Sequence, residues 1–221
     1  MKRNLPLGLL ALCLALMAAG CSRSPRVTFY TLEPSAGAEV SASAALSPSA
    51  AQTAPTAPTA SAPSAPSAPS VAVGPVTLPD LVDRPQLVVR VAANRVEILE
   101  SQRWAEPLKS EIPRVVAQEL ARRLASTRVS SYQQHSGPTA DYRVLLDVQR
   151  FEAAPGQAVT VEADWTVRRA GGKTRTGHAL VREPLKETGY DAVAAGFSRA
   201  LRAVSGEIAG AIRAEAGAEK P

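Results

Sequence analysis

The side chains that most often carry out chemistry in proteins are sparse in this 221-residue sequence. Its two histidines, His135 and His178, have no second type of metal ligand at a suitable spacing. Glu162 and Asp164 share one face of an alternating segment and could act as an acid–base pair in a cleft, but a solvated sheet face gives this pattern more often. We therefore expect no catalytic residue, no metal ion and no cofactor.

The segment Gly171-Gly172-Lys173-Thr174 has the ending of a phosphate-binding loop. That loop also needs a glycine five residues before its second glycine, where this sequence has Val167 within an alternating strand pattern. We interpret these residues as a hairpin turn. The hydrolase pattern Gly-x-Ser-x-Gly is absent from the sequence, whereas a Ser/His/Asp site assembled from distant residues stays open.

Basic residues gather around the same turn, namely Arg168, Arg169, Lys173 and Arg175. Such a cluster can contact anionic lipid or an acidic partner, but a soluble hairpin tip needs no partner, and the sequence favours this second interpretation. The whole chain has 25 basic and 20 acidic residues. This bias is too small to predict nucleic acid as a partner.

Cys21 is the side chain for which the sequence predicts a covalent modification. Two basic residues are followed by an apolar run from Leu5 to Met17, which is shorter than the roughly 20 residues that cross a bilayer core. This order predicts a secretory signal. The residues before Cys21 are small, as in a lipobox, and cleavage between Gly20 and Cys21 would leave the thiol at the new N-terminus, where bacterial lipoproteins are lipidated. The alternative is an ordinary signal peptide with an incidental cysteine.

Five parts make up the predicted chain. Residues 1–20 are a lipoprotein signal peptide, 21–32 a lipid-anchored N-terminus with a short strand, 33–70 an Ala/Pro/Ser-rich disordered linker or insertion, 71–216 a single domain and 217–221 a disordered tail. If everything before residue 71 were a tether, Phe29, Tyr30 and Leu32 would face water. We therefore favour docking of Val27–Leu32 on the domain, which makes the biased tract a long insertion.

Hydrophobic periodicity predicts the elements of the domain. Alternation predicts strands at Val71–Leu78, Gln86–Val91, Arg95–Leu99, Asp141–Phe151, Gln157–Arg168 and Lys173–Glu183, with Pro75 suited to a sheet edge or exit. Spacings of three and four predict one helix from near Ile112, with Pro113 in its first turn and Glu111 and Arg114 on the solvent side, and another from Tyr190 to about Ala214. The predicted fold class is α+β, an antiparallel-rich mixed sheet with two amphipathic helices packed on one face.

Several short motifs follow one another in an order that resembles a known family. They are the lipobox, Phe29-Tyr30-Thr31-Leu32, Val73-Gly74-Pro75-Val76-Thr77-Leu78-Pro79, Asp83-Arg84-Pro85-Gln86, Asn94-Arg95-Val96, Arg103-Trp104-Ala105-Glu106-Pro107-Leu108 and Asp141-Tyr142-Arg143-Val144. The chain is similar to the auxiliary lipoproteins of MCE (mammalian cell entry) lipid-transport systems, the paraquat-inducible protein C family of ABC-type transport auxiliary components. The Ala/Pro/Ser tract is longer than the family usually carries.

The resemblance implies a lipoprotein that is not an enzyme, is anchored in the outer membrane by its acyl chains and faces the periplasm. It implies docking on the MCE-domain protein of the same ABC transport system, which moves lipids between the two membranes, and it allows a homo-oligomer. Ser22 is not the aspartate that usually retains lipoproteins in the inner membrane. The alternatives are a stand-alone envelope lipoprotein that binds peptidoglycan or assists outer-membrane assembly, and a secreted hydrolase.

Six residues in the motifs or in the turn from Asp80 to Pro85 are candidates for partner binding, namely Phe29, Tyr30, Leu32, Asp80, Arg84 and Trp104. The hypothesis is that Phe29 and Tyr30 form an edge strand beside Val71–Leu78, or mediate self-association by strand pairing. These positions are equally compatible with the core. For Trp104, packing at a helix start is the favoured alternative.

Overall fold

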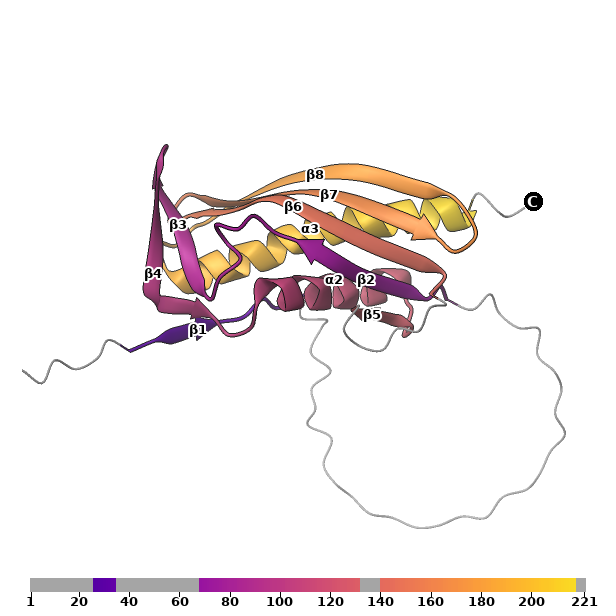
Figure 1. The fold of residues 1–221 in the computed structure, drawn as a ribbon, viewed down its shortest axis with the longest axis horizontal. Helices are drawn as coiled ribbons and strands as arrows, with labels where there is room; N and C mark the ends of the chain where they lie inside the picture. The colour runs from indigo at the N-terminus through magenta and orange to yellow at the C-terminus, as the bar shows by residue number, and fades with distance from the viewer. Residues whose placement is uncertain (1–25, 35–67, 132–139, 218–221) are drawn as a thin grey trace, which may run out of the picture.

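A computed structural model describes residues 26–34, 68–131 and 140–217 of the chain. Cys21, the predicted signal peptide, His135 and residues 218–221 lie outside the described residues. Most of the fold is a five-stranded mixed sheet with two helices on one face, and a smaller three-stranded sheet stands at one end (Figure 1). The fold class is therefore α+β, as predicted.

The larger sheet has the strand order β5-β2-β6-β7-β8. Its strands are β2 (Val71–Thr77), β5 (Val129–Ser131), β6 (Tyr142–Ala154), β7 (Ala158–Arg169) and β8 (Thr174–Pro184). The antiparallel hairpins β6–β7 and β7–β8 form where alternation was predicted, and Gly171 in the second turn has a φ of 68°, which suits glycine. β2 pairs in parallel with β5 and β6.

Alternation along β6 explains how this strand faces the core. Tyr142, Val144, Leu146 and Val148 are all buried, as predicted. The register with β7 then shifts between Val148 and Arg150, so the next buried side chain is Phe151. An extra residue at such a bulge changes which positions face the core, from even-numbered to odd-numbered ones. The apolar side chains after the bulge therefore stay on the helix side of the sheet.

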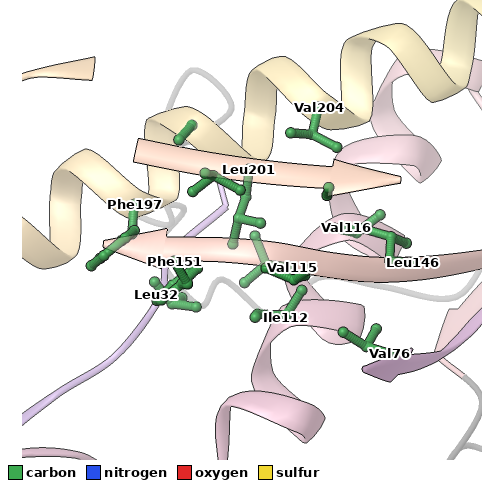
Figure 2. Packing of buried hydrophobic residues seen from close by; sticks show 14 of the residues in the cluster. Leu32, Val76, Ile112, Val115, Val116, Leu146, Phe151, Phe197, Leu201 and Val204 are labelled. Carbon is green, nitrogen blue, oxygen red and sulfur yellow. The ribbon is translucent and has the colours of Figure 1, made fainter. Parts of the chain in front are cut away.

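The two helices are α2 (Leu108–Leu124) and α3 (Tyr190–Gly217), which pack against each other and against the larger sheet. The predicted stripe of α3 is buried from Val193 to Ile212. At the centre of the core, the rings of Phe151 and Phe197 stack with centroids 3.8 Å apart, and Leu32 lies near them (Figure 2). Each such fully buried side chain contributes about 1.5–3 kcal/mol.

One expectation about the strands differs from the structure. The hairpin β3 (Gln86–Ala92) and β4 (Arg95–Trp104) forms, but it belongs to a separate three-stranded sheet of order β1-β4-β3. Val73 is the last β2 residue that pairs with β5, so the exposed Pro75 lies on a side of β2 with no paired strand in the described part of the chain, as the sequence favoured. The β2–β6 register shifts between Val73 and Val76, and a proline is tolerated at such an irregularity because its missing N–H leaves no gap in a regular ladder.

The predicted start of the first helix was also wrong. α2 begins at Leu108, so Pro113 lies in its second turn. A proline there removes one backbone hydrogen bond and costs about 3 kcal/mol or more in an isolated helix. Leu108, Ile112 and Pro113 are all buried, and this packing offsets the lost bond.

Candidate functional site

The N-terminal strand β1 (Thr28–Tyr30) lies in parallel beside β4 at the edge of the smaller sheet. Tyr30 and Trp104 are register partners; the Tyr30 hydroxyl donates to Gln102 Oε1 at 2.6 Å, and the Ala105 N–H donates to the Tyr30 carbonyl at 2.8 Å. The segment Val27–Leu32 is thus docked on the domain, as favoured from the sequence. Its partner is β4, however, and the hypothesis that it pairs beside Val71–Leu78 was wrong.

A buried carboxylate fastens the end of this segment. Glu111 of α2 is fully buried, and its Oε1 accepts the Leu32 N–H at 2.8 Å. Arg114 donates to the Leu32 carbonyl at 3.0 Å and lies 3.4 Å from the same carboxylate oxygen. The Glu33 N–H donates to Ser198 Oγ of α3 at 3.0 Å. Burial raises the pKa of Glu111, while the Leu32 N–H and then Arg114 oppose that shift.

Glu111 was predicted on the solvent side of the helix, and this was wrong. The sequence around Glu111 does not indicate its burial, because the segment that covers it, at Leu32, comes from 79 residues earlier in the chain. The pair of Glu111 and Arg114 is therefore the part of the site that sequence reasoning missed.

A second set of contacts fastens the chain where it returns to the domain before β2. Asp141 Oδ2 accepts the Ser70 N–H at 2.8 Å and the Ser70 hydroxyl at 2.7 Å. Arg128 donates to the Ala68 carbonyl, and the Ser126 hydroxyl donates to the Pro69 carbonyl at 2.7 Å. The hydrogen bonds from the Ser70 N–H and hydroxyl lower the pKa of Asp141, with a smaller contribution from the Arg128 charge. Both ends of the stretch between Pro34 and Ala68 are thus held.

The six predicted partner-binding residues divide into two groups. Tyr30, Leu32 and Trp104 are buried, with exposed fractions of 8%, 0% and 5%. The Trp104 ring meets the core phenylalanines edge-on at 6.3 and 6.1 Å. These three side chains hold β1 in place and expose little surface to a partner. Phe29 is 62% exposed, Asp80 is exposed and Arg84 is half-buried.

A cavity of about 330 Å³ lies beside Phe29 and brings the motif segments together. Its lining includes Phe29, Asp83, Arg84, Pro85, Trp104 and Leu108, whereas Asp80 does not line it. Arg84 Nε is buried without a hydrogen-bond partner among the described residues. Asp83 forms an ion pair with Lys109, in which Lys109 Nζ lies 2.5 Å from Asp83 Oδ2. We call the exposed side chains of Phe29 and Pro85, the half-buried Arg84 and this cavity the β1 surface.

A second cavity, of about 500 Å³, lies on the other side of Phe29 between β1 and α3. It is lined by Tyr30, Glu33, Asp191 and Arg199, among others. Phe29 therefore projects between two hollows, next to a strand whose outer edge pairs with no strand in the described part of the chain. An edge strand with an exposed aromatic and adjoining hollows suits the addition of a partner's chain.

The residues considered for catalysis lie on an open face of the larger sheet. His178 Nδ1 lies 2.8 Å from Asp164 Oδ1, and His178 Nε2 lies 3.6 Å from Glu162 Oε1. The side chains of His178 and Asp164 are 51% and 56% exposed, and they line neither cavity beside Phe29. In residues 26–34, 68–131 and 140–217, no group of three or more His, Cys, Asp or Glu side chains could hold a metal ion. No helix in those ranges is long and apolar enough to span a membrane.

The described residues form a small α+β domain with an exposed aromatic side chain and a cavity at one sheet edge. A family model described as the ABC-type transport auxiliary lipoprotein component matches residues 50–209, so the chain belongs to this family and the predicted resemblance is confirmed. The family is one of transport lipoproteins and not of enzymes. Membership also indicates a location in the cell envelope with a membrane anchor, and association with an ABC transport system.

Two solved structures resemble the chain. A protein from Xanthomonas campestris described by the family model DUF330 is 22% identical, with a TM-score of 0.57, and the match covers 76% of this chain and 97% of that one. An uncharacterized protein is 19% identical, with a TM-score of 0.58, and the match covers 66% of this chain and 94% of that one. At these identities the likeness shows the shared fold. Comparison with curated proteins gave no match.

Proposed function

We propose that this chain is the auxiliary lipoprotein of an MCE-type ABC transport system that moves lipids between the inner and outer membranes. It acts without catalysis, by binding the MCE-domain protein of that system. Acyl chains on Cys21 anchor it in the outer membrane, and the domain faces the periplasm. Each buried methylene of those chains adds about 0.8 kcal/mol to membrane binding.

The observation that carries this proposal is the convergence of the family motifs on the β1 surface. Segments around residues 29, 84 and 104 are separated by up to 75 positions in the sequence, yet all line one cavity. Phe29 presents an exposed ring, and Arg84 is half-buried with an Nε that has no hydrogen-bond partner among the described residues. An aromatic side chain and an arginine beside a free strand edge are typical of protein interfaces.

The position of β1 in the chain also fits a lipid anchor. Thr28 follows Cys21 by seven residues, a stretch that reaches about 25 Å at most when extended. A domain tethered in this way stays close to its membrane, with the β1 surface beside the anchor. A protein that reaches across the periplasm can meet this surface only near the membrane, which is where an MCE assembly would deliver or collect lipid.

Copurification from the envelope tests the proposal. A C-terminally tagged full-length chain is purified from detergent-solubilised envelopes and all proteins are identified by mass spectrometry. We expect an MCE-domain protein together with an acylated N-terminal peptide beginning at Cys21. Recovery of cell-wall or outer-membrane assembly proteins alone would favour the stand-alone envelope lipoprotein.

A variant of the β1 surface tests the docking site. Phe29→Ser removes the exposed ring, and we expect at least a tenfold loss of the copurified MCE-domain protein with no change in the melting temperature. Leu180→Ser is the matched control, because Leu180 is 59% exposed on β8 and lies outside the β1 surface. Equal recovery with both variants would show that the β1 surface is not the docking site.

A further inference from the structure

Basic side chains gather at the end of the larger sheet that is remote from β1. Four exposed residues lie there: Arg143, the second residue of β6; Arg168, near the end of β7; Lys173, in the following turn; and Arg175, the second residue of β8. Figure 1 shows this turn at the far end of the molecule from the β3–β4 hairpin. We call these four residues the basic end.

Two of these arginines face each other across the β6–β7 ladder. Arg143 and Arg168 are register partners, and neither side chain makes a hydrogen bond or ion pair within the described residues. Like charges directly opposite one another on a sheet are destabilising. Further along the same ladder, Arg150 has Glu162 as its partner, with a nitrogen–oxygen distance of 3.2 Å. The ladder thus holds an opposite-charge pair at one position and a repulsive pair at the basic end.

The acids around the basic end already have partners. Asp141 accepts the N–H and hydroxyl of Ser70, and it lies 3.4 Å from Arg128. Glu215 of α3 lies 3.6 Å from Arg175. Arg143, Arg168 and Lys173 are therefore left with uncompensated charge, and an external anion would relieve their repulsion. Guanidinium groups bind carboxylates through paired hydrogen bonds, so carboxylates are well suited to this place.

The length of α3 separates the basic end from the anchor. Asp191 of α3 lines the cavity beside Phe29, and Glu215 contacts Arg175 at the other end of the helix. Glu215 comes 24 positions after Asp191, which corresponds to about 36 Å along a helix. The predicted lipid attachment is only seven residues before β1. The basic end thus lies far from the predicted anchor, on the side that would face the periplasm. There a protein, rather than the anchoring bilayer, would contact it.

From the repulsive arginine pair and this position, we infer that the basic end docks an acidic surface of a second envelope protein, in addition to the contact made by the β1 surface. Carboxylates of that partner lie between Arg143 and Arg168 and reach Lys173 in the turn. Because the contact is electrostatic and exposed, it weakens as ionic strength rises.

Lys173 allows a direct test with a zero-length carbodiimide, which joins an amine to a carboxylate already in contact with it. Envelopes containing the tagged full-length chain are treated with the reagent, and linked peptides are identified by mass spectrometry. We expect Lys173 to be joined to an Asp or Glu of another protein, with a yield that falls at least fivefold at 0.5 M NaCl. Lys186 is the matched control, since it is exposed but lies outside the basic end.

Arg168→Glu separates binding from folding. The substitution gives Arg143 a carboxylate directly opposite, so we expect an unchanged or higher melting temperature together with at least a tenfold loss of the Lys173 link. Arg182→Glu changes an exposed arginine elsewhere on β8 and should keep the link.

Three outcomes would overturn the inference. The first is a Lys173 yield no higher than that of Lys186. The second is a set of links confined to this chain or to another copy of it. The third is that Lys173 forms no link to any protein, while the chain binds phosphatidylethanolamine–phosphatidylglycerol vesicles and Arg168→Glu abolishes that binding. None of these results depends on the identity of the protein bound at the β1 surface.

Discussion

Leu32→Ala should reveal how strongly the N-terminal segment stabilises the domain. The Leu32 side chain is fully buried, and the backbone on either side of it is held by Glu111 and Arg114. Replacing a fully buried leucine by alanine costs about 2–5 kcal/mol, because transfer energy is lost and a cavity remains. We expect a loss of about 3 kcal/mol in the free energy of unfolding. The loss cannot exceed the free energy that docking of the segment contributes to folding. Beyond that limit, the segment detaches while the rest of the domain stays folded.

Urea unfolding of a Cys21→Ser chain without the signal peptide measures this loss. With a slope of about 1–3 kcal/mol per molar urea, a loss of 3 kcal/mol lowers the midpoint by about 1–3 M. The two tryptophans report on different places, since Trp104 is the register partner of Tyr30 in β1 and Trp165 lies in β7. If the segment detaches first, the Trp104 fluorescence of a Trp165→Phe chain changes before the circular dichroism of the larger sheet.

Val27→Ala serves as the control, because Val27 belongs to the same segment but is 44% exposed. Surface substitutions of this kind usually change stability by less than about 0.5 kcal/mol. If Leu32→Ala and Val27→Ala lower the midpoint equally, the segment is not a part of the core, and the account of β1 given above fails.

Three further predictions concern packing and protonation. Gly177→Ala should destabilise the domain by about 1–3 kcal/mol in thermal unfolding, because the new Cβ would lie 2.1 Å from the Trp165 ring, whereas Gly210→Ala, in an open helical position, should stabilise it by up to about 1 kcal/mol. Burial raises the pKa of Glu111, so wild-type stability should fall as the pH rises from 4.5 through the folded pKa, and Glu111→Gln should remove that fall in urea titrations at successive pH values. The pKa of Asp141 is lowered, so Asp141→Ala should cost about 1–2 kcal/mol at pH 7, and the difference from wild type should shrink as the pH falls below 3.8 and through the folded pKa.

Periodicity was enough to predict most elements of the larger sheet and the stripe of α3. A strand or helix with one buried face repeats its apolar residues at a fixed interval, and this can be read from a few consecutive positions. The buried alternation of β7, from Val159 to Val167, is an example. The start of α2 was missed because Pro113 was assumed to fix it, while the burial of Leu108 and Ile112 decided it instead.

Strand partners were harder to predict than the strands. The pairing of β1 with β4 joins residues more than 70 positions apart, and a three-residue strand contains too few side chains to identify its neighbour. The burial of Glu111 depends on the same long-range contact. The motifs around Arg84 and Trp104 were recognised from the sequence, but their convergence on one cavity required the fold. Phe29 remains a predicted binding residue, now with a defined surface around it.

The contacts at the two ends of the biased tract have a mechanical consequence. A pull on the lipid anchor proposed at Cys21 would enter the domain through β1, where the pairing with β4 and the Glu111 and Arg114 contacts at Leu32 would resist it. Because Asp141 holds the returning chain separately, the tract between Pro34 and Ala68 carries none of this load. With the anchor proposed at Cys21, a longer or shorter tract would leave the reach from membrane to domain unchanged, because that reach depends on the six residues between Cys21 and β1.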